Sequence, residues 1–256
     1  MKKPIYVTCA VLAGCLTLLS AGCGNSTDTT AADKAVFTYD ECDGGVMLLQ
    51  YDYDETIASG NGSGKLMIDI PSEIDGKRVV KLGEYLMKEV PDTYDIAVTV
   101  PATVKEIDDK AFCSDDESVW FEEEGTGYWK YHGYVSSVTV DEANENYSSE
   151  DGALYNKDKT KLLYFRRSRL EKQPIVFRVP DSVEYIADTY IYYYGETVLG
   201  TECVDIYIGK NVKQIDAWIR NSDFWTYYRY HVYQDSYADE WLKQEGIERT
   251  DYVTFQ

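Results

Sequence analysis

A short sequence phrase recurs along this chain, and each copy has apolar residues in the same positions. Residues 100–107 read VPATVKEI, residues 179–186 read VPDSVEYI, residues 208–215 read IGKNVKQI, and an earlier copy begins IPSEI at residue 70. Copies spaced by a few tens of residues are typical of proteins that stack one structural unit on the next. Such proteins usually bind their partners through an extended surface. The chain is therefore predicted to be a repeat protein.

Each copy follows a segment in which apolar and polar residues alternate, such as IAVTV at residues 96–100. Alternation of this kind predicts a half-buried strand. Proline at 71, 101 and 180 is expected to end the strand, because it cannot donate the next hydrogen bond of the ladder. The apolar residues after it, such as Val104, are expected to face the core from the other side of the coil. Successive strands should then pair into parallel sheets.

One copy departs from this pattern. The strand predicted at residues 135–140 is followed by Asp141 where the other copies have proline. Residues 152–164 then predict a β-hairpin whose turn lies at residues 156–160.

Both ends of the repeat region have signals of their own. Residues 36–51 contain two strand-like segments around a Gly-Gly turn, which predicts a small β cap. Near the other end, Ser236 is placed to cap a short helix together with Asp239, and Gly246 is placed to end it.

The first residues have the pattern of a targeting signal. Lys2 and Lys3 precede an apolar run over residues 5–19, which is shorter than the ~20 apolar residues of a membrane-spanning helix. The Ala-Gly-Cys sequence that ends at Cys23 resembles the bacterial lipobox, in which the cysteine is lipid-modified and becomes the mature N-terminus. We predict lipidation at Cys23 and anchoring to a membrane through that lipid.

Two alternatives stay open at this end of the chain. Cys15 has the aliphatic residue of the lipobox three positions before it, but would leave an apolar segment at the mature N-terminus. Secretion with ordinary cleavage nearby is the other alternative. The expected parts of the chain are a lipoprotein signal peptide at 1–22, a polar tether at 23–35, the repeats with their caps at 36–250, and a tail at 251–256.

The chain is strongly acidic, with a formal net charge of −20. Nucleic acid and anionic lipid surfaces are bound by basic patches, so neither is an expected partner. The two histidines, His132 and His231, lack the spacing of a zinc site and are interpreted as loop or strand residues. The sequence has no Asp-x-Asp-x-Asp-Gly calcium ladder and no Gly-x-Ser-x-Gly nucleophile motif. We therefore predict no catalytic residue, metal or cofactor.

Three cysteines follow Cys23, namely Cys42, Cys113 and Cys203. Because the count is odd, at least one of them is a free thiol or pairs with another chain. Cys113 and Cys203 are interpreted as buried thiols that fill small apolar positions of the repeats.

A strand followed by Pro-x-x-Val-x-x-Ile and then Ala-Phe, as at residues 96–112, resembles the BspA-like leucine-rich repeats of bacterial surface proteins. Residues 70–77, 147–158 and 236–241 resemble the opening, hairpin-bearing and terminal segments of that family. The resemblance covers residues 36–250. It implies a β-rich solenoid, a leucine-rich-repeat-like right-handed coil with a short parallel sheet, a small N-terminal β cap and a C-terminal helical cap. It also implies adhesion to, or recognition of, host or microbial macromolecules.

Aromatic residues gather in the insertion at residues 114–134. Insertions in stacked repeats often form the binding face, and Tyr and Trp are frequent interface anchors. A second aromatic cluster lies at residues 190–194, and a third at residues 224–230 is the alternative binding site. Packing of these rings over the edge of the stack is the structural alternative. The predicted binding residues are Trp120, Phe121, Tyr128, Trp129 and Tyr131.

Taken together, these features predict a non-enzymatic lipoprotein, exposed at a bacterial cell surface, that binds an extracellular protein or glycan. Two other functions stay open. One is a carbohydrate-active hydrolase that uses paired carboxylates. The other is a structural envelope protein with no dedicated ligand.

Overall fold

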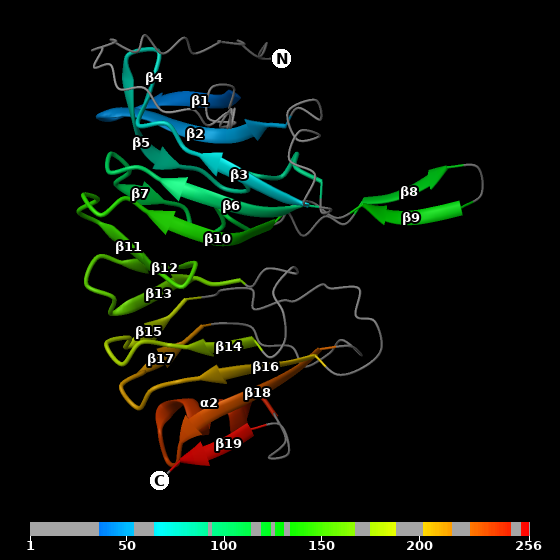
Figure 1. The fold of residues 1–256 in the computed structure, drawn as a ribbon, viewed down its shortest axis with the longest axis vertical. Coiled ribbons are helices and arrows are strands. Elements are labelled where there is room, and N and C mark those ends of the chain that lie inside the picture. The colour runs from blue at the N-terminus through cyan, green and yellow to red at the C-terminus, as the bar shows by residue number, and fades with distance from the viewer. Residues whose placement is uncertain are drawn as a thin grey trace, which may run out of the picture.

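The computed structural model describes residues 36–53, 64–91, 94–113, 119–123, 126–130, 134–166, 175–187, 202–216, 226–246 and 252–255. These residues form mainly β-strands, together with one short helix, α2 (Tyr237–Gln244). The strands lie one above another from the N-terminal to the C-terminal end of the molecule (Figure 1). Among the described residues, no helix has both the length and the apolar character needed to cross a membrane.

Successive repeats supply neighbouring strands of two all-parallel sheets, which confirms the predicted pairing. One sheet has the order β3 (Lys65–Asp69), β6 (Asp95–Val100), β10 (Tyr134–Val140). The other has the order β14 (Ile175–Arg178), β16 (Glu202–Tyr207), β18 (Thr226–Tyr233), β19 (Tyr252–Phe255). Equivalent residues are level across the first sheet, where Ile68 pairs with Val98 and Val98 with Val138. All three are buried.

Other strands, several of them only two residues long, form the opposite side of the repeats (Figure 1). Two parallel sets are present, β2 (Gly45–Asp52) with β5 (Lys77–Leu82) and β7 (Glu106–Ile107), and β13 (Lys161–Tyr164) with β15 (Tyr185–Ile186) and β17 (Gln214–Ile215). Antiparallel partners extend these sets: β1 (Val36–Cys42) on β2, β4 (Glu73–Ile74) on β5, and β11 (Tyr147–Glu150) and β12 (Ala153–Asn156) next to β13. The predicted β cap and the predicted hairpin are both present.

In four of the described repeats, the turn after the strand is closed by the same backbone hydrogen bond. The acceptor is the carbonyl one or two residues after the end of the strand, and the donor is the N–H three residues later. The donor and acceptor pairs are Val104 to Pro101 (3.3 Å), Asn144 to Asp141 (2.9 Å), Val183 to Pro180 (3.0 Å) and Val212 to Gly209 (3.4 Å). The valine side chains in this position are buried, as the sequence predicted.

Asn144 occupies the position that valine holds in the other turns, and its side chain is fully buried. The amide nitrogen donates to the carbonyl oxygens of Pro101 (3.0 Å) and Val104 (2.9 Å) in the preceding repeat. The amide oxygen accepts from the N–H groups of Asn146 and Tyr147, each at 2.9 Å. Asn144 thus joins backbone groups of two successive repeats, and both polar atoms of its buried amide have partners.

Buried apolar residues form two clusters, and the hairpin β12–β13 lies between them. Leu154 and Tyr164 belong to the cluster built from the N-terminal repeats. Tyr155 and Leu162 belong to the cluster built from the C-terminal repeats. On β12, Leu154 and Tyr155 face opposite ways because successive residues of a strand alternate. On β13, Leu162 and Tyr164 are two residues apart and reach different clusters because the pairing with β12 has a register shift between them.

The C-terminal cap agrees with the prediction at its start and its end. Ser236 Oγ accepts from the Asp239 N–H at 3.2 Å, and Gly246 follows the helix with φ of +74°. The sheet, however, extends past residue 250, where the repeat region was expected to end. Strand β19 pairs with β18, and the Gln234 N–H donates to the Phe255 carbonyl at 2.7 Å.

Candidate functional site

The sheet β14-β16-β18-β19 has one apolar face and one charged and aromatic face. Phe177, Ile206 and Tyr230 point inward and are buried in the C-terminal cluster. On each strand, the residues next to these inward residues face the other way, because side chains alternate along a strand. We call this opposite side the outer face, and its residues include Arg178, Asp205, Tyr207, Arg229, His231 and Tyr233.

Three planar side chains stack across neighbouring strands of the outer face. Arg178, Tyr207 and His231 are level with one another in the register. The Arg178 guanidinium carbon lies 3.7 Å from the centre of the Tyr207 ring. The Tyr207 and His231 rings are 4.0 Å apart and nearly parallel, with 5° between their planes. This Tyr207 stack covers both faces of the tyrosine, and the guanidinium gains a cation–π contact.

Asp205 holds the histidine of this stack in place. Its Oδ1 atom lies 2.6 Å from His231 Nε2 and 3.8 Å from a guanidinium nitrogen of Arg229. A carboxylate only accepts, so Nε2 carries the proton of this hydrogen bond. Within the described structure, His231 Nδ1 is buried and has no hydrogen-bond partner. The imidazole is therefore a fixed part of the stack, with neither nitrogen open to solvent as a base.

A pocket of about 150 Å³, partly open to solvent, lies beside the stack. This volume is below the roughly 300–1,000 Å³ of drug-sized ligand sites, so the pocket has room only for a small group. Strands β14, β16, β18 and β19 and the turns that follow β14 and β16 supply its walls. Its lining includes Arg178, Asp181, Tyr207, Gly209, Tyr233 and Phe255.

Gly209 gives this pocket its space. It lies two residues after β16, at the turn position that Pro101, Asp141 and Pro180 hold in other repeats. A Cβ atom placed on Gly209 would lie 3.3 Å from Asp181 Oδ1, which is closer than an ordinary contact, so a larger residue would crowd that carboxylate at the pocket. We refer to this feature as the Gly209 pocket.

The predicted binding residues lie on a separate two-stranded sheet. Strands β8 (Val119–Glu123) and β9 (Thr126–Lys130) form an antiparallel hairpin that stands away from the stacked sheets (Figure 1). The register pairs Trp120 with Trp129 and Phe121 with Tyr128. The hairpin therefore brings four of the five predicted residues together, and Tyr131 lies outside the described residues.

The histidines, the cysteines and the alternative aromatic cluster singled out from the sequence lie in several different parts of the molecule. Cys23 and His132 lie outside the described residues, whereas His231 is on strand β18, as one of the sequence interpretations allowed. Tyr230, from the alternative aromatic cluster, belongs to the core. The remaining cysteines are Cys42, a half-buried free thiol, Cys113, which is buried, and Cys203, which lies on β16.

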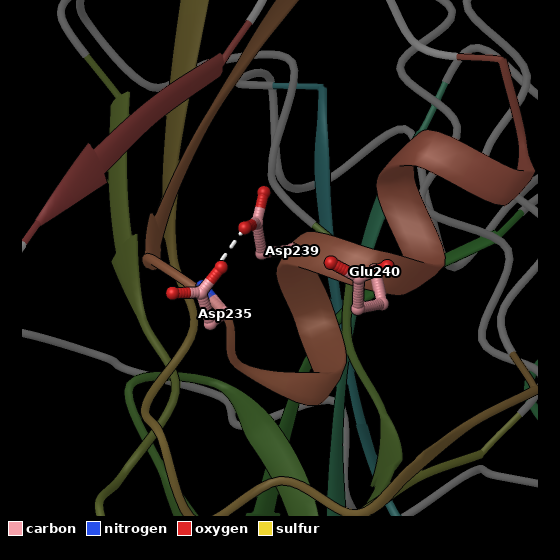
Figure 2. A group of neighbouring side chains, drawn as sticks. All are labelled: Asp235, Asp239 and Glu240. Carbon is pink, nitrogen blue, oxygen red and sulfur yellow. Dashed lines mark hydrogen bonds between the residues drawn. The ribbon is translucent and has the colours of Figure 1, made fainter.

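Three carboxylates gather at the start of α2, at Asp235, Asp239 and Glu240 (Figure 2). Their oxygens lie within 4.8 Å of one another. Asp239 Oδ2 accepts from the Asp235 N–H at 2.9 Å and from Lys243 Nζ at 3.0 Å, and Lys243 also donates to Glu240 at 2.6 Å. The hydrogen bonds to Glu240 and Asp239 raise the pKa of Lys243. This lysine and the helix N-terminus account for the carboxylates as a helix cap.

The residues of the outer face were missed by sequence reasoning. Arg178, Tyr207 and His231 are separated by tens of residues, and only the register of the strands makes them neighbours. The one available signal was glycine at the position of proline in the third copy of the phrase.

No protein-family model matches the sequence, and no curated protein matches it. Among solved structures, a leucine-rich repeat protein from Eubacterium ventriosum is 19% identical with a TM-score of 0.36, over 66% of this chain and 37% of that protein. The pneumococcal vaccine antigen PcpA is 13% identical with a TM-score of 0.21, over 71% of this chain and 64% of that protein. This chain thus spans less than two thirds of either protein. At TM-scores below 0.5, neither similarity assigns this chain a fold or a function.

Proposed function

We propose that this chain is a lipid-anchored recognition protein on the outside of a bacterial cell, without enzymatic activity, and that it binds an extracellular protein or glycan through its repeat surface. The observation that carries the proposal is the outer face of sheet β14-β16-β18-β19, with the Gly209 pocket beside it. Aromatic and arginine side chains are enriched at binding surfaces. His231 and Asp205 are held in contacts with each other and their neighbours, which supports binding over catalysis.

The parallel pairing of equivalent strands supports a BspA-like solenoid as the scaffold for this surface. A connection between parallel strands of one sheet is right-handed in nearly all proteins, which supports the right-handed coil. Stacked repeats display a row of outward side chains on a rigid frame, and a recognition protein needs such a frame.

Binding is tested by passing the purified full chain over a panel of extracellular-matrix proteins and over an array of immobilised glycans. We expect saturable binding to at least one of these ligands, and loss of that binding when the chain is heat-denatured. An absence of saturable binding to both sets would favour a structural envelope protein. If a bound glycan is cleaved, and Asp181→Asn stops the cleavage, the protein is a hydrolase instead.

Lipid anchoring is tested by growing cells with a fatty-acid probe. We expect the chain to carry the probe and Cys23→Ala to lose it, because the thiol of Cys23 is the proposed attachment point. Cys15→Ala is the matched control and should keep the label. If the label is lost in Cys15→Ala and retained in Cys23→Ala, the lipid is attached to Cys15 and the assignment to Cys23 is wrong.

The hairpin β8–β9 is proposed as a second contact surface for the partner. Trp120→Ala and Trp129→Ala are each expected to weaken binding by about 2 kcal/mol, roughly thirtyfold in Kd, because truncation of an aromatic anchor has an effect of this size. Glu122→Gln should change mainly the salt dependence of binding. A lower Tm with unchanged affinity would show instead that the tryptophans only support the fold.

A further inference from the structure

We infer that the Gly209 pocket binds a single ring of a neutral glycan, with two neighbouring hydroxyl groups hydrogen-bonded to Arg178 and Asp181. This inference rests on the proposed recognition function and assigns its ligand class. Three properties of the pocket support this inference. They are the exposed ring surfaces in its wall, the charged side chains there that have no ion-pair partner in the described structure, and the space next to Gly209.

The ring surfaces available to a ligand are those of Tyr233 and Phe255. The Tyr207 ring is covered on both faces by Arg178 and His231, so it offers the pocket only its edge. Tyr233 and Phe255 remain 38% and 39% exposed, with ring centres 6.0 Å apart and 55° between their planes. Two tilted rings form an angled apolar wall. The C–H groups of a sugar ring carry partial positive charge and are attracted to the negative face of an aromatic ring.

Two charged side chains at the pocket, the cation Arg178 and the anion Asp181, are available to a ligand. Arg229 and His231 already share the carboxylate of Asp205. Within the described structure, Arg178 and Asp181 have no ion-pair partner, and both line the pocket. A guanidinium only donates hydrogen bonds and a carboxylate only accepts them. Adjacent hydroxyl groups do both, so a sugar diol satisfies both side chains at once.

The overall charge of the chain argues for a neutral sugar over an acidic one. With a net charge of −20, the protein repels anionic ligands at long range. Asp181 adds a local repulsion at the pocket itself. Uronic and sialic acids are therefore disfavoured relative to neutral hexoses.

The space for the ring exists because Gly209 has no side chain. Its φ lies outside the left-handed region, so the backbone does not require glycine there. The proline at the same position of two other repeats shows that the turn accepts this residue. Gly209→Pro therefore fills the pocket with a residue that the fold already uses.

The test is saturation-transfer NMR on the purified full chain, with the methyl glycosides of galactose, glucose, mannose and N-acetylglucosamine as probes. We expect at least one of them to receive saturation. Gly209→Pro should abolish the transfer with an unchanged Tm, and Arg178→Ala and Asp181→Asn should each weaken binding at least tenfold. Lys210→Ala, an exposed neighbour that does not line the pocket, should bind as the unmodified chain does.

Three outcomes would overturn the inference. The first is no transfer to any of these glycosides. The second is transfer that Asp181→Asn and Gly209→Pro leave unchanged. The third is binding only of methyl glucuronide or of a lysine-rich peptide, which would assign the pocket to an acidic sugar or to a protein partner. If Gly209→Pro lowers the Tm, that variant is set aside, and the effects of Asp181→Asn and Arg178→Ala on glycoside binding decide whether the inference holds. Binding to a matrix protein that persists in all these variants would leave the recognition function intact and remove only the glycan.

Discussion

Val104→Asp is expected to lower the free energy of unfolding by more than about 4 kcal/mol, which would leave much of the protein unfolded at room temperature. Val104 is fully buried in the turn between β6 and β7, within the N-terminal cluster. A carboxylate there would be removed from water without a partner, and this is among the most costly changes a core can undergo. Urea denaturation followed by circular dichroism measures the loss.

Lys105→Asp is the matched control, one residue away. The Lys105 side chain is exposed, and the backbone N–H of this residue donates to the Val80 carbonyl at 2.8 Å. The substitution changes the net charge more than Val104→Asp does, yet we expect a change in stability within about 0.5 kcal/mol. Equal losses in the two variants would show that the repeat register is wrong.

Asn144→Ala is expected to lower the free energy of unfolding by about 3 to 5 kcal/mol. The substitution removes all four hydrogen bonds of the buried amide. The Pro101 carbonyl keeps the Val104 N–H as a donor, and the other three backbone groups lose their bond to the amide. A buried polar group without a partner costs about 1–3 kcal/mol, and the vacated space adds to this. Chemical denaturation again provides the measurement, with the midpoint and the slope fitted separately.

Asn146→Ala isolates the contribution of burial in this comparison. Asn146 is exposed and two residues from Asn144, so the same atoms are removed from a side chain that faces solvent. Its backbone N–H and carbonyl groups remain in place for Asn144 and Lys157. A loss in Asn146→Ala comparable to that in Asn144→Ala would mean that the amide network does not hold the turn.

The repeats, the hairpin and the cap could be predicted because their signals are local. Alternation along residues 96–100 determines which side of a strand is buried, and proline after it fixes where the ladder stops. The hairpin at 152–164 and the cap at Ser236 likewise depend on a few consecutive residues. Each of these features appears in the structure within the expected segment.

The outer face could not be predicted because it is produced by register. Nothing local to Arg178 or His231 indicates that Tyr207 lies between them. The role of Asn144 was hidden for a related reason, since its partners Pro101 and Val104 belong to the preceding repeat. Strand β19 consists of four residues that favour strands, but a segment this short does not indicate its partner, which is β18.

The hairpin β12–β13 also has a consequence for how the protein loses its structure. Stacked repeats ordinarily melt in pieces, because each unit contacts only its neighbours. Here Leu154 and Tyr164 are buried in one cluster while Tyr155 and Leu162 are buried in the other. When either half unfolds, one side of the shared hairpin becomes exposed, and the hairpin then packs less stably against the other half. We therefore expect the two halves to unfold cooperatively. Amide hydrogen exchange should be slowest in this hairpin and similar on its two sides.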